Sequence, residues 1–161
     1  MRFGKKTAVL CAPCTGECIP LSEIPDEAFA GGMLGLGFGV EPQEGHFCAP
    51  IGGHVESVAQ AKHAYTLLTD DGLDVLVHIG VDTVRMGGEG FVPRVSAGQY
   101  VKAGDVIADA DLALIRARGL PATVAVLVTN SDMIADAEYT YGSVALGRDP
   151  VMRFCIKKGG K

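Results

Sequence analysis

Two of the four histidines, His63 and His78, lie at the ends of a stretch that has the pattern of a β-hairpin. A leucine-rich and β-branched run, 73–81, follows the turn signal Asp70-Asp71-Gly72. If Asp71-Gly72 forms a two-residue loop, residue 65 lies opposite His78 and the two histidines project from the same face. Their Cα atoms would then be roughly 7–8 Å apart, close enough for the rings to converge. The prediction requires an even loop, because an odd loop would put the imidazoles on opposite faces.

An imidazole near pH 7 offers a neutral nitrogen that can act as a nucleophile without strong activation. Gly80 and Asp82 are expected on the same face as His78. Gly80 leaves the space beside the imidazole empty, which suits the close approach of another backbone or a ligand. Asp82 would lie roughly 13 Å away along a straight strand, so the chain must bend at Gly80 to bring it near. The alternate residues of the run are expected in the core: Val75, Val77 and Ile79.

The rest of the chain has the composition of a globular all-β domain that presents this hairpin. It has 161 residues, of which 48% are hydrophobic and 20% charged, and its 22 glycines without a short period fit many tight turns. The net charge of −5, without a lysine or arginine cluster, gives no support to nucleic-acid binding. No apolar run approaches the roughly 20 residues that span a bilayer, and no signal-peptide cleavage site follows the first residues. We expect one domain over 1–161 in a cytoplasmic protein without direct membrane insertion.

Strand-like runs recur at short intervals between Gly, Pro, Asn or Asp residues, which is typical of an antiparallel β-sandwich or barrel. They are 7–12, 17–21, 38–41, 54–59, 65–69, 73–81, 105–108, 122–129, 143–146 and 151–157. Helical signals are limited to short turns at 25–30 and at 111–118, the latter capped by Asp109 or Asp111. Cys11-Ala12-Pro13-x-x-Gly16 recurs as Cys48-Ala49-Pro50-x-x-Gly53, which indicates an internally duplicated strand–turn–strand unit.

The remaining residues that could bind a metal have no supporting pattern. The spacing Cys11-x2-Cys14-x3-Cys18 lacks the second close pair that a tetrahedral zinc site usually has. We therefore interpret the five cysteines as reduced thiols that act as small buried hydrophobic side chains. His46 and His54 have no chemical context in the sequence and are interpreted as structural.

The run from His63 to Phe91, HAYTLLTDDGLDVLVHIGVDTVRMGGEGF, resembles the signature of the glucose-type IIA domain of the bacterial phosphoenolpyruvate-dependent sugar phosphotransferase system. The shared features are a His-Ala pair, a glycine after it, His-x-Gly-x-Asp-Thr-Val and Gly-Glu-Gly-Phe. Two further segments match the same family, APCTGECIPLSEIPDEAFA at 12–30 and the turn 101–105. The resemblance covers about residues 7–157.

This resemblance implies an all-β phosphocarrier that needs no cofactor and no metal. His78 would accept a phosphoryl group from the histidine phosphocarrier protein and pass it to a cysteine of the IIB domain of a membrane sugar permease. His63 would donate a hydrogen bond to the phosphoryl oxygens, and Asp82 would orient the site or meet a cation on the partner. The chain departs from the family where it has Leu36 between two glycines in place of the usual aspartate, and Ala61 in place of the usual threonine.

Three other interpretations of the two histidines remain open. They could be structural residues of a half-buried sheet. A zinc-dependent peptidase with a related β-fold would use a His-x-His pair, but His78-Ile79-Gly80 lacks the second ligand. A biotinyl- or lipoyl-type carrier is suggested by Gly98–Asp105, although no lysine stands in the usual hairpin tip.

Overall fold

The computed structural model describes residues 6–157, and these form fourteen strands and five short helical segments. The first seven strands are β1 (Lys6–Cys11), β2 (Gly16–Pro20), β3 (Leu36–Pro42), β4 (His46–Cys48), β5 (Gly53–Val58), β6 (Ala64–Leu68) and β7 (Asp74–Ile79). The others are β8 (Phe91–Pro93), β9 (Tyr100–Val101), β10 (Val106–Ala110), β11 (Val124–Val128), β12 (Ile134–Tyr139), β13 (Gly142–Val144) and β14 (Pro150–Ile156). The helical segments are α1 (Glu27–Ala30), α2 (Leu112–Ala117) and the 3-10 turns η1 (Leu21–Glu23), η2 (Thr83–Met86) and η3 (Ser131–Met133).

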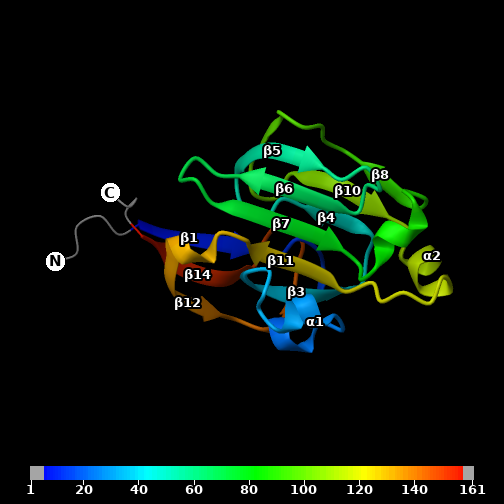
Figure 1. Cartoon of the computed structure of the whole chain (residues 1–161), viewed down its shortest axis with the longest axis horizontal. Coiled ribbons are helices and arrows are strands. Elements are labelled where there is room, and N and C mark those ends of the chain that lie inside the picture. The colour runs from blue at the N-terminus through cyan, green and yellow to red at the C-terminus, as the bar shows by residue number, and fades with distance from the viewer. Residues whose placement is uncertain (1–5, 158–161) are drawn as a thin grey trace.

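The strands form one large and two small antiparallel sheets. The large sheet has the order β13-β2-β3-β11-β7-β6-β5-β9, and its central strands lie side by side in Figure 1. The small sheets have the orders β1-β14-β12 and β4-β10-β8. One buried cluster joins all three sheets, with Tyr65 from the large sheet and Phe154 and Phe47 from the small ones. The predicted all-β sandwich with at most short helical turns is confirmed.

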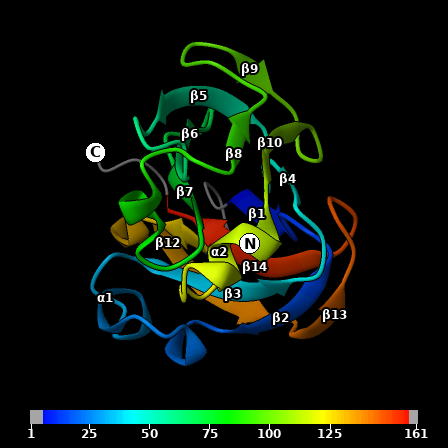
Figure 2. The same ribbon diagram turned by 90° about the vertical axis from the view of Figure 1, so that its right-hand side faces the viewer.

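Strand β11 lies at the centre of the large sheet and is buried on both faces. Val124, Val126 and Val128 point into the main core, as the period of two along a strand requires. Ala125 and Leu127 point to the other face, where a second cluster with Ile24 and Phe29 covers them. The η1–α1 segment therefore forms an outer layer on this sheet, which Figures 1 and 2 show beside β3.

The two Cys-Ala-Pro segments lie together and are related by an approximate internal symmetry. Cys11 N donates to the Pro50 carbonyl at 2.9 Å, and Cys48 N donates to the Pro13 carbonyl at 2.7 Å. Ala12 N and Ala49 N in turn donate to the carbonyls of Asp149 and Asp105, each at 2.9 Å. The predicted internal duplication is thus visible as matching hydrogen bonds in the two halves.

Both predicted helical turns are present. The Asp26 carboxylate accepts from Ala28 N and begins α1, and the Asp111 carboxylate accepts from Leu114 N and begins α2. All ten predicted strands occur, with ends that differ by a few residues. Four strands were missed, because β4, β8 and β9 are very short and β12 carries alternating polar residues at a sheet edge: His46–Cys48, Phe91–Pro93, Tyr100–Val101 and Ile134–Tyr139.

Candidate functional site

His78 lies on the outer face of the large sheet, in the strand with the regular alternation. Val75, Val77 and Ile79 of β7 are fully buried in the main core, as predicted, so the residues between them point outward. The cross-strand partners of His78 are two alanines, Ala125 on β11 and Ala64 on β6. These small neighbours leave room on this face of the sheet for the half-buried imidazole.

The predicted hairpin register is wrong by one residue. Ala64, not residue 65, lies opposite His78, and Thr69 N donates to the Leu73 carbonyl at 3.0 Å. Asp70, Asp71 and Gly72 are the residues left between Thr69 and Leu73, so the loop is odd. The Thr69 hydroxyl also accepts from Leu73 N at 3.0 Å, which helps to fix this closure.

The two imidazoles nevertheless meet, with ring centroids 4.8 Å apart and planes at 87°. Strand β6 begins only at Ala64, and Lys62 just before His63 has a left-handed backbone with φ 67°. The side-chain alternation of β6 therefore does not extend to His63, and an odd register does not separate it from His78. The prediction that the two histidine rings lie together is confirmed. The even hairpin register on which it was based is wrong.

The His78 ring is held by the backbone that follows it. Its Nδ1 lies 2.8 Å from the Gly80 carbonyl oxygen, which can only accept, so Nδ1 carries the proton and Nε2 the lone pair. Gly80 has φ +81° and ends β7, which is the bend that the sequence required there. The space beside Gly80 is occupied by Thr83, because a Cβ on Gly80 would lie 2.4 Å from Thr83 Cγ2. The expected close approach at Gly80 is therefore made by the chain itself.

Burial favours the neutral form of both histidines. His63 is only 7% exposed, and burial, with the neighbouring His78, lowers the pKa of His63 to about 4. Burial also lowers the pKa of His78, whereas the Gly80 carbonyl, Asp26 and Asp82 act in the opposite direction. Two neutral imidazoles near pH 7 can supply one lone pair and one N–H to the same reacting group.

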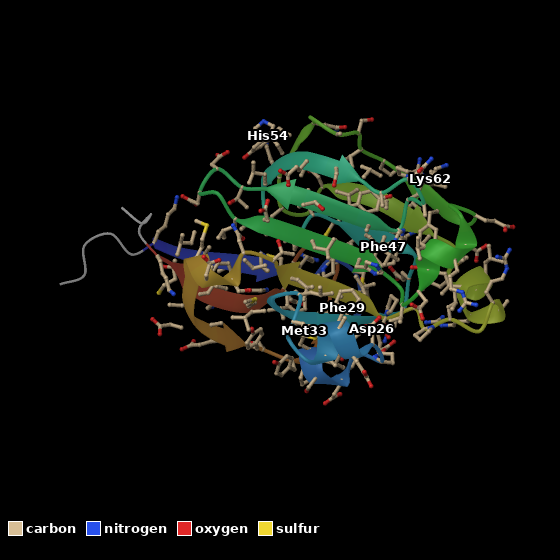
Figure 3. The ribbon with its side chains drawn as sticks, viewed as in Figure 1. Asp26, Phe29, Met33, Phe47, His54 and Lys62 are labelled. Atoms are coloured by element: carbon tan, nitrogen blue, oxygen red, sulfur yellow. The ribbon has the colours of Figure 1, made fainter. Side chains whose placement is uncertain are left out.

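The outer layer supplies two residues that the sequence did not point to. The Phe29 ring packs edge-on against His78 at a centroid distance of 5.1 Å, and Asp26 caps the helix that carries Phe29. Figure 3 shows Asp26, Phe29 and Met33 close together on the α1 segment. A capping Asp before a short apolar run was visible in the sequence, but nothing local indicated that α1 packs on β7.

Asp82 lies at the rim of the site. It is exposed, has φ 60° and precedes η2, and its charge acts on His78 to raise that pKa. Its side chain does not cap η2, so the carboxylate remains available at the surface. A role in meeting a partner stays a prediction.

Exposed apolar side chains lie on the segment after α1 and on η2. Met33 is 83% exposed, Leu34 43% and Leu36 42%, all following α1, and Val84 on η2 is 56% exposed. Val84 and His63 also line a pocket of about 410 Å³ with Ala59, Gln60, Ala61 and Gly87. Apolar surface beside a polar reacting group is typical of a docking site for a protein partner.

The other histidines and the cysteines lie in different surroundings. His46 contacts the Asp109 carboxylate at 2.7 Å, and His54 packs against Tyr100 at a centroid distance of 5.0 Å, so both are exposed residues with local partners. The five cysteines are free; Cys14, Cys18 and Cys48 are buried as predicted, whereas Cys11 and Cys155 are only partly buried. Burial raises the pKa of Cys18 and of Cys48 to about 12. Within residues 6–157, no group of three or more His, Cys, Asp or Glu side chains could hold a metal ion. No helix in this same part of the chain is long and apolar enough to cross a membrane.

Comparisons with known proteins agree with this geometry. The family described as phosphoenolpyruvate-dependent sugar phosphotransferase system, EIIA 1, matches residues 8–134. A glucose-specific EIIA component from Staphylococcus aureus (strain Mu50) is 40% identical over 156 residues, covering 93% of this chain and 94% of that protein. The corresponding component from Bacillus cereus (strain ATCC 14579) is 38% identical over 158 residues, covering 96% of each.

A solved structure shows the same fold. Glucose permease IIA from Mycoplasma capricolum superimposes with a TM-score of 0.88 at 34% sequence identity, covering 95% of this chain and 99% of that one. The family match and the relatives extend over both histidines and over the outer layer that packs on them. The chain therefore belongs to the EIIA 1 family of the phosphoenolpyruvate-dependent sugar phosphotransferase system.

Proposed function

We propose that His78 carries a transient phosphoryl group on Nε2. The observation that carries this proposal is the hydrogen bond from His78 Nδ1 to the Gly80 carbonyl, because it leaves the lone pair on Nε2, with His63 4.8 Å away. The Nε2 lone pair attacks phosphorus, a new N–P bond forms, and the bond from phosphorus to the donor's nitrogen breaks. Positive charge develops on the His78 ring as this happens, and the Gly80 carbonyl stabilises it through the Nδ1–H bond.

The donor in this proposal is the histidine phosphocarrier protein, and the acceptor is a cysteine of the IIB domain of a sugar permease. Membership of the EIIA family and the exposed apolar residues beside the site support two successive protein partners. The curated relatives are named glucose-specific, so glucose is the sugar we propose for the pathway. The sugar itself would meet the permease and not this chain.

His63 and Asp82 have supporting parts in the proposal. A neutral His63 can donate one N–H to the phosphoryl oxygens, and its burial excludes water from the labile N–P bond. Such a positioned donor is typically worth about 3–4 kcal/mol in the transition state. Asp82, exposed at the rim, would meet a cation on the incoming partner.

The direct test is incubation with phosphoenolpyruvate and the two general upstream proteins, followed by mass measurement. The chain should gain one phosphoryl group that is stable in base and lost in acid, and His78→Ala should gain none. His63→Gln should still load, but transfer to IIB should slow by about 10²- to 10³-fold. Normal loading of His78→Ala would remove the assignment, and unchanged rates in His63→Gln would make His63 a structural residue.

A further inference from the structure

A hollow of about 370 Å³ lies where the β13 edge of the large sheet meets β14 of a small sheet. Tyr141 and Ser143 line it from the β13 side, and Asp149, Pro150 and Arg153 line it from the β14 side. Three strands separate β13 from β7, which is four strand spacings or about 19 Å along the sheet. Figure 2 shows β13 on the opposite side of the molecule from α1. The hollow is therefore distinct from the site of the two histidines.

The hollow holds one positive and one negative side chain that do not pair with each other. Arg153 faces Glu138 across β12 and β14, yet the guanidinium forms no ion pair or hydrogen bond within residues 6–157. The Asp149 carboxylate accepts from Ala145 N through Oδ2 at 2.7 Å, which leaves its other oxygen available to a ligand. Burial raises the pKa of Cys11, Asp149 adds to this effect and Arg153 opposes it, so both charges act on the same thiol and lie near each other.

Apolar side chains supply the rest of the lining. The Tyr141 ring stacks on Tyr139 with centroids 5.7 Å apart and planes at 7°, and Tyr139 in turn packs against the main core. Tyr141 is held in this way and is still 44% exposed. Val144 and Pro150 add aliphatic surface to the lining. A ring that its neighbour already holds offers apolar contact area with little conformational entropy to lose on binding.

We propose that this hollow binds a free α-amino acid with an apolar or aromatic side chain. The carboxylate of the ligand accepts from the Arg153 guanidinium, its ammonium group donates to Asp149, and its side chain lies against the Tyr141 ring. A zwitterion gives each charge of the hollow an opposite charge, and charge-assisted hydrogen bonds are about twice as strong as neutral ones. A phosphorylated sugar fits less well because the Asp149 carboxylate repels a phosphate, and a neutral sugar leaves both charges without a charged partner.

The test is a titration of the full ¹⁵N-labelled chain with L-phenylalanine, followed by the backbone amide shifts. We expect saturable shifts at Tyr141, Ser143 and Arg153 and none at His78. Phenethylamine lacks the carboxylate and hydrocinnamate lacks the ammonium group, so each should bind at least about 10-fold more weakly, as for the loss of one hydrogen bond between charged groups. These analogues test the two contacts without any substitution in the chain. The titration involves no phosphoryl transfer, so its result is independent of the proposed function.

Substitutions then assign the contacts to residues. Arg153→Gln and Asp149→Asn each remove one charge, and the asparagine keeps an oxygen for Ala145 N; each should weaken L-phenylalanine binding by at least about 10-fold. Arg148→Gln is the matched control, because Arg148 is exposed and does not line the hollow, and it should bind as the wild-type chain does. Shifts that do not saturate, equal affinity for hydrocinnamate, or unchanged affinity in Arg153→Gln would overturn the proposal. Saturable binding of glucose or its phosphate ester at the same amides, in place of L-phenylalanine, would also overturn it.

Discussion

Replacing Gly80 with alanine tests how the backbone holds the His78 ring. Gly80 has φ +81°, and a Cβ in the left-handed region costs about 1–2 kcal/mol. The added Cβ would also lie 2.4 Å from Thr83 Cγ2 and 3.2 Å from the Pro121 carbonyl oxygen. Relief of such a clash by local movement typically costs about 1–3 kcal/mol. Gly80→Ala should therefore lower the free energy of unfolding by about 2–5 kcal/mol.

A substitution at Thr83 separates the cost of the left-handed backbone at residue 80 from the cost of the steric clash. Thr83→Ser removes Cγ2 but keeps the hydroxyl that donates to the Ile79 carbonyl at 2.5 Å. Alone it should cost about 0.5–1.5 kcal/mol, as for the loss of one buried methyl group. In the double variant the alanine methyl occupies the vacated space, so the combined loss should be smaller than the sum of the single losses by about 1–3 kcal/mol.

The assay is chemical denaturation followed by far-UV circular dichroism, since the chain has no tryptophan. Gly119→Ala is the matched control, because Gly119 has φ +76° and no heavy atom of residues 6–157 lies within 4 Å of the added Cβ. Gly119→Ala should lower the free energy of unfolding only by the cost of an alanine in the left-handed region, because the added Cβ meets no clash. Equal losses in Gly80→Ala and Gly119→Ala, or strict additivity with Thr83→Ser, would refute the reasoning.

Three further predictions concern the surroundings of the site. Leu36→Asp should steepen the salt dependence of transfer to a IIB domain that carries an arginine, because a rim charge acts on encounter and is screened; an unchanged slope would place residue 36 outside the docking surface. The pKa of His63 is lowered to about 4 in the folded chain, so below pH 6.5 the unfolded chain binds more protons than the folded chain. The free energy of unfolding should therefore fall by about 3 kcal/mol from pH 6.5 towards pH 4. Denaturation curves of His63→Gln across the same range should lose most of this dependence. Asp26→Ala should destabilise the α1 segment by about 0.5–2 kcal/mol and broaden the His78 ring signals, whereas Asp26→Asn keeps the cap and should do neither.

The sequence predicted what depends on local periodicity and local polar chemistry. Alternation placed Val75 and Val77 in the core and His78 outside it, and Asp111 was among the residues expected to begin α2. Each of these features is decided within a few residues of chain. The class of fold follows from the same local patterns, whereas the histidines meet only because Lys62 leaves the extended conformation just before His63.

The hairpin register could not be predicted because two closures fit the same residues. Asp70-Asp71-Gly72 can form an even or an odd loop, and the choice depends on the Thr69 hydroxyl and on Gly72, which has φ +89°. The contact between Phe29 and His78 was missed for a different reason. It joins segments far apart in the sequence, and Phe29 belongs to the outer cluster that covers the small Ala125 of β11.

The odd register and the left-handed residue before His63 are best understood together. In an odd register, a fully extended strand would direct His63 to the core face, opposite to His78. Lys62 at φ 67° ends that extension one residue earlier, and Gly80 ends β7 just after His78. The two rings therefore meet near the end of the β6–β7 pairing, where the His63 carbonyl still accepts from Ile79 N at 2.8 Å. The His78 ring is oriented through the Gly80 carbonyl at Nδ1, whereas His63 Nδ1 has no hydrogen-bond partner among residues 6–157 and the His63 ring packs edge-on against His78.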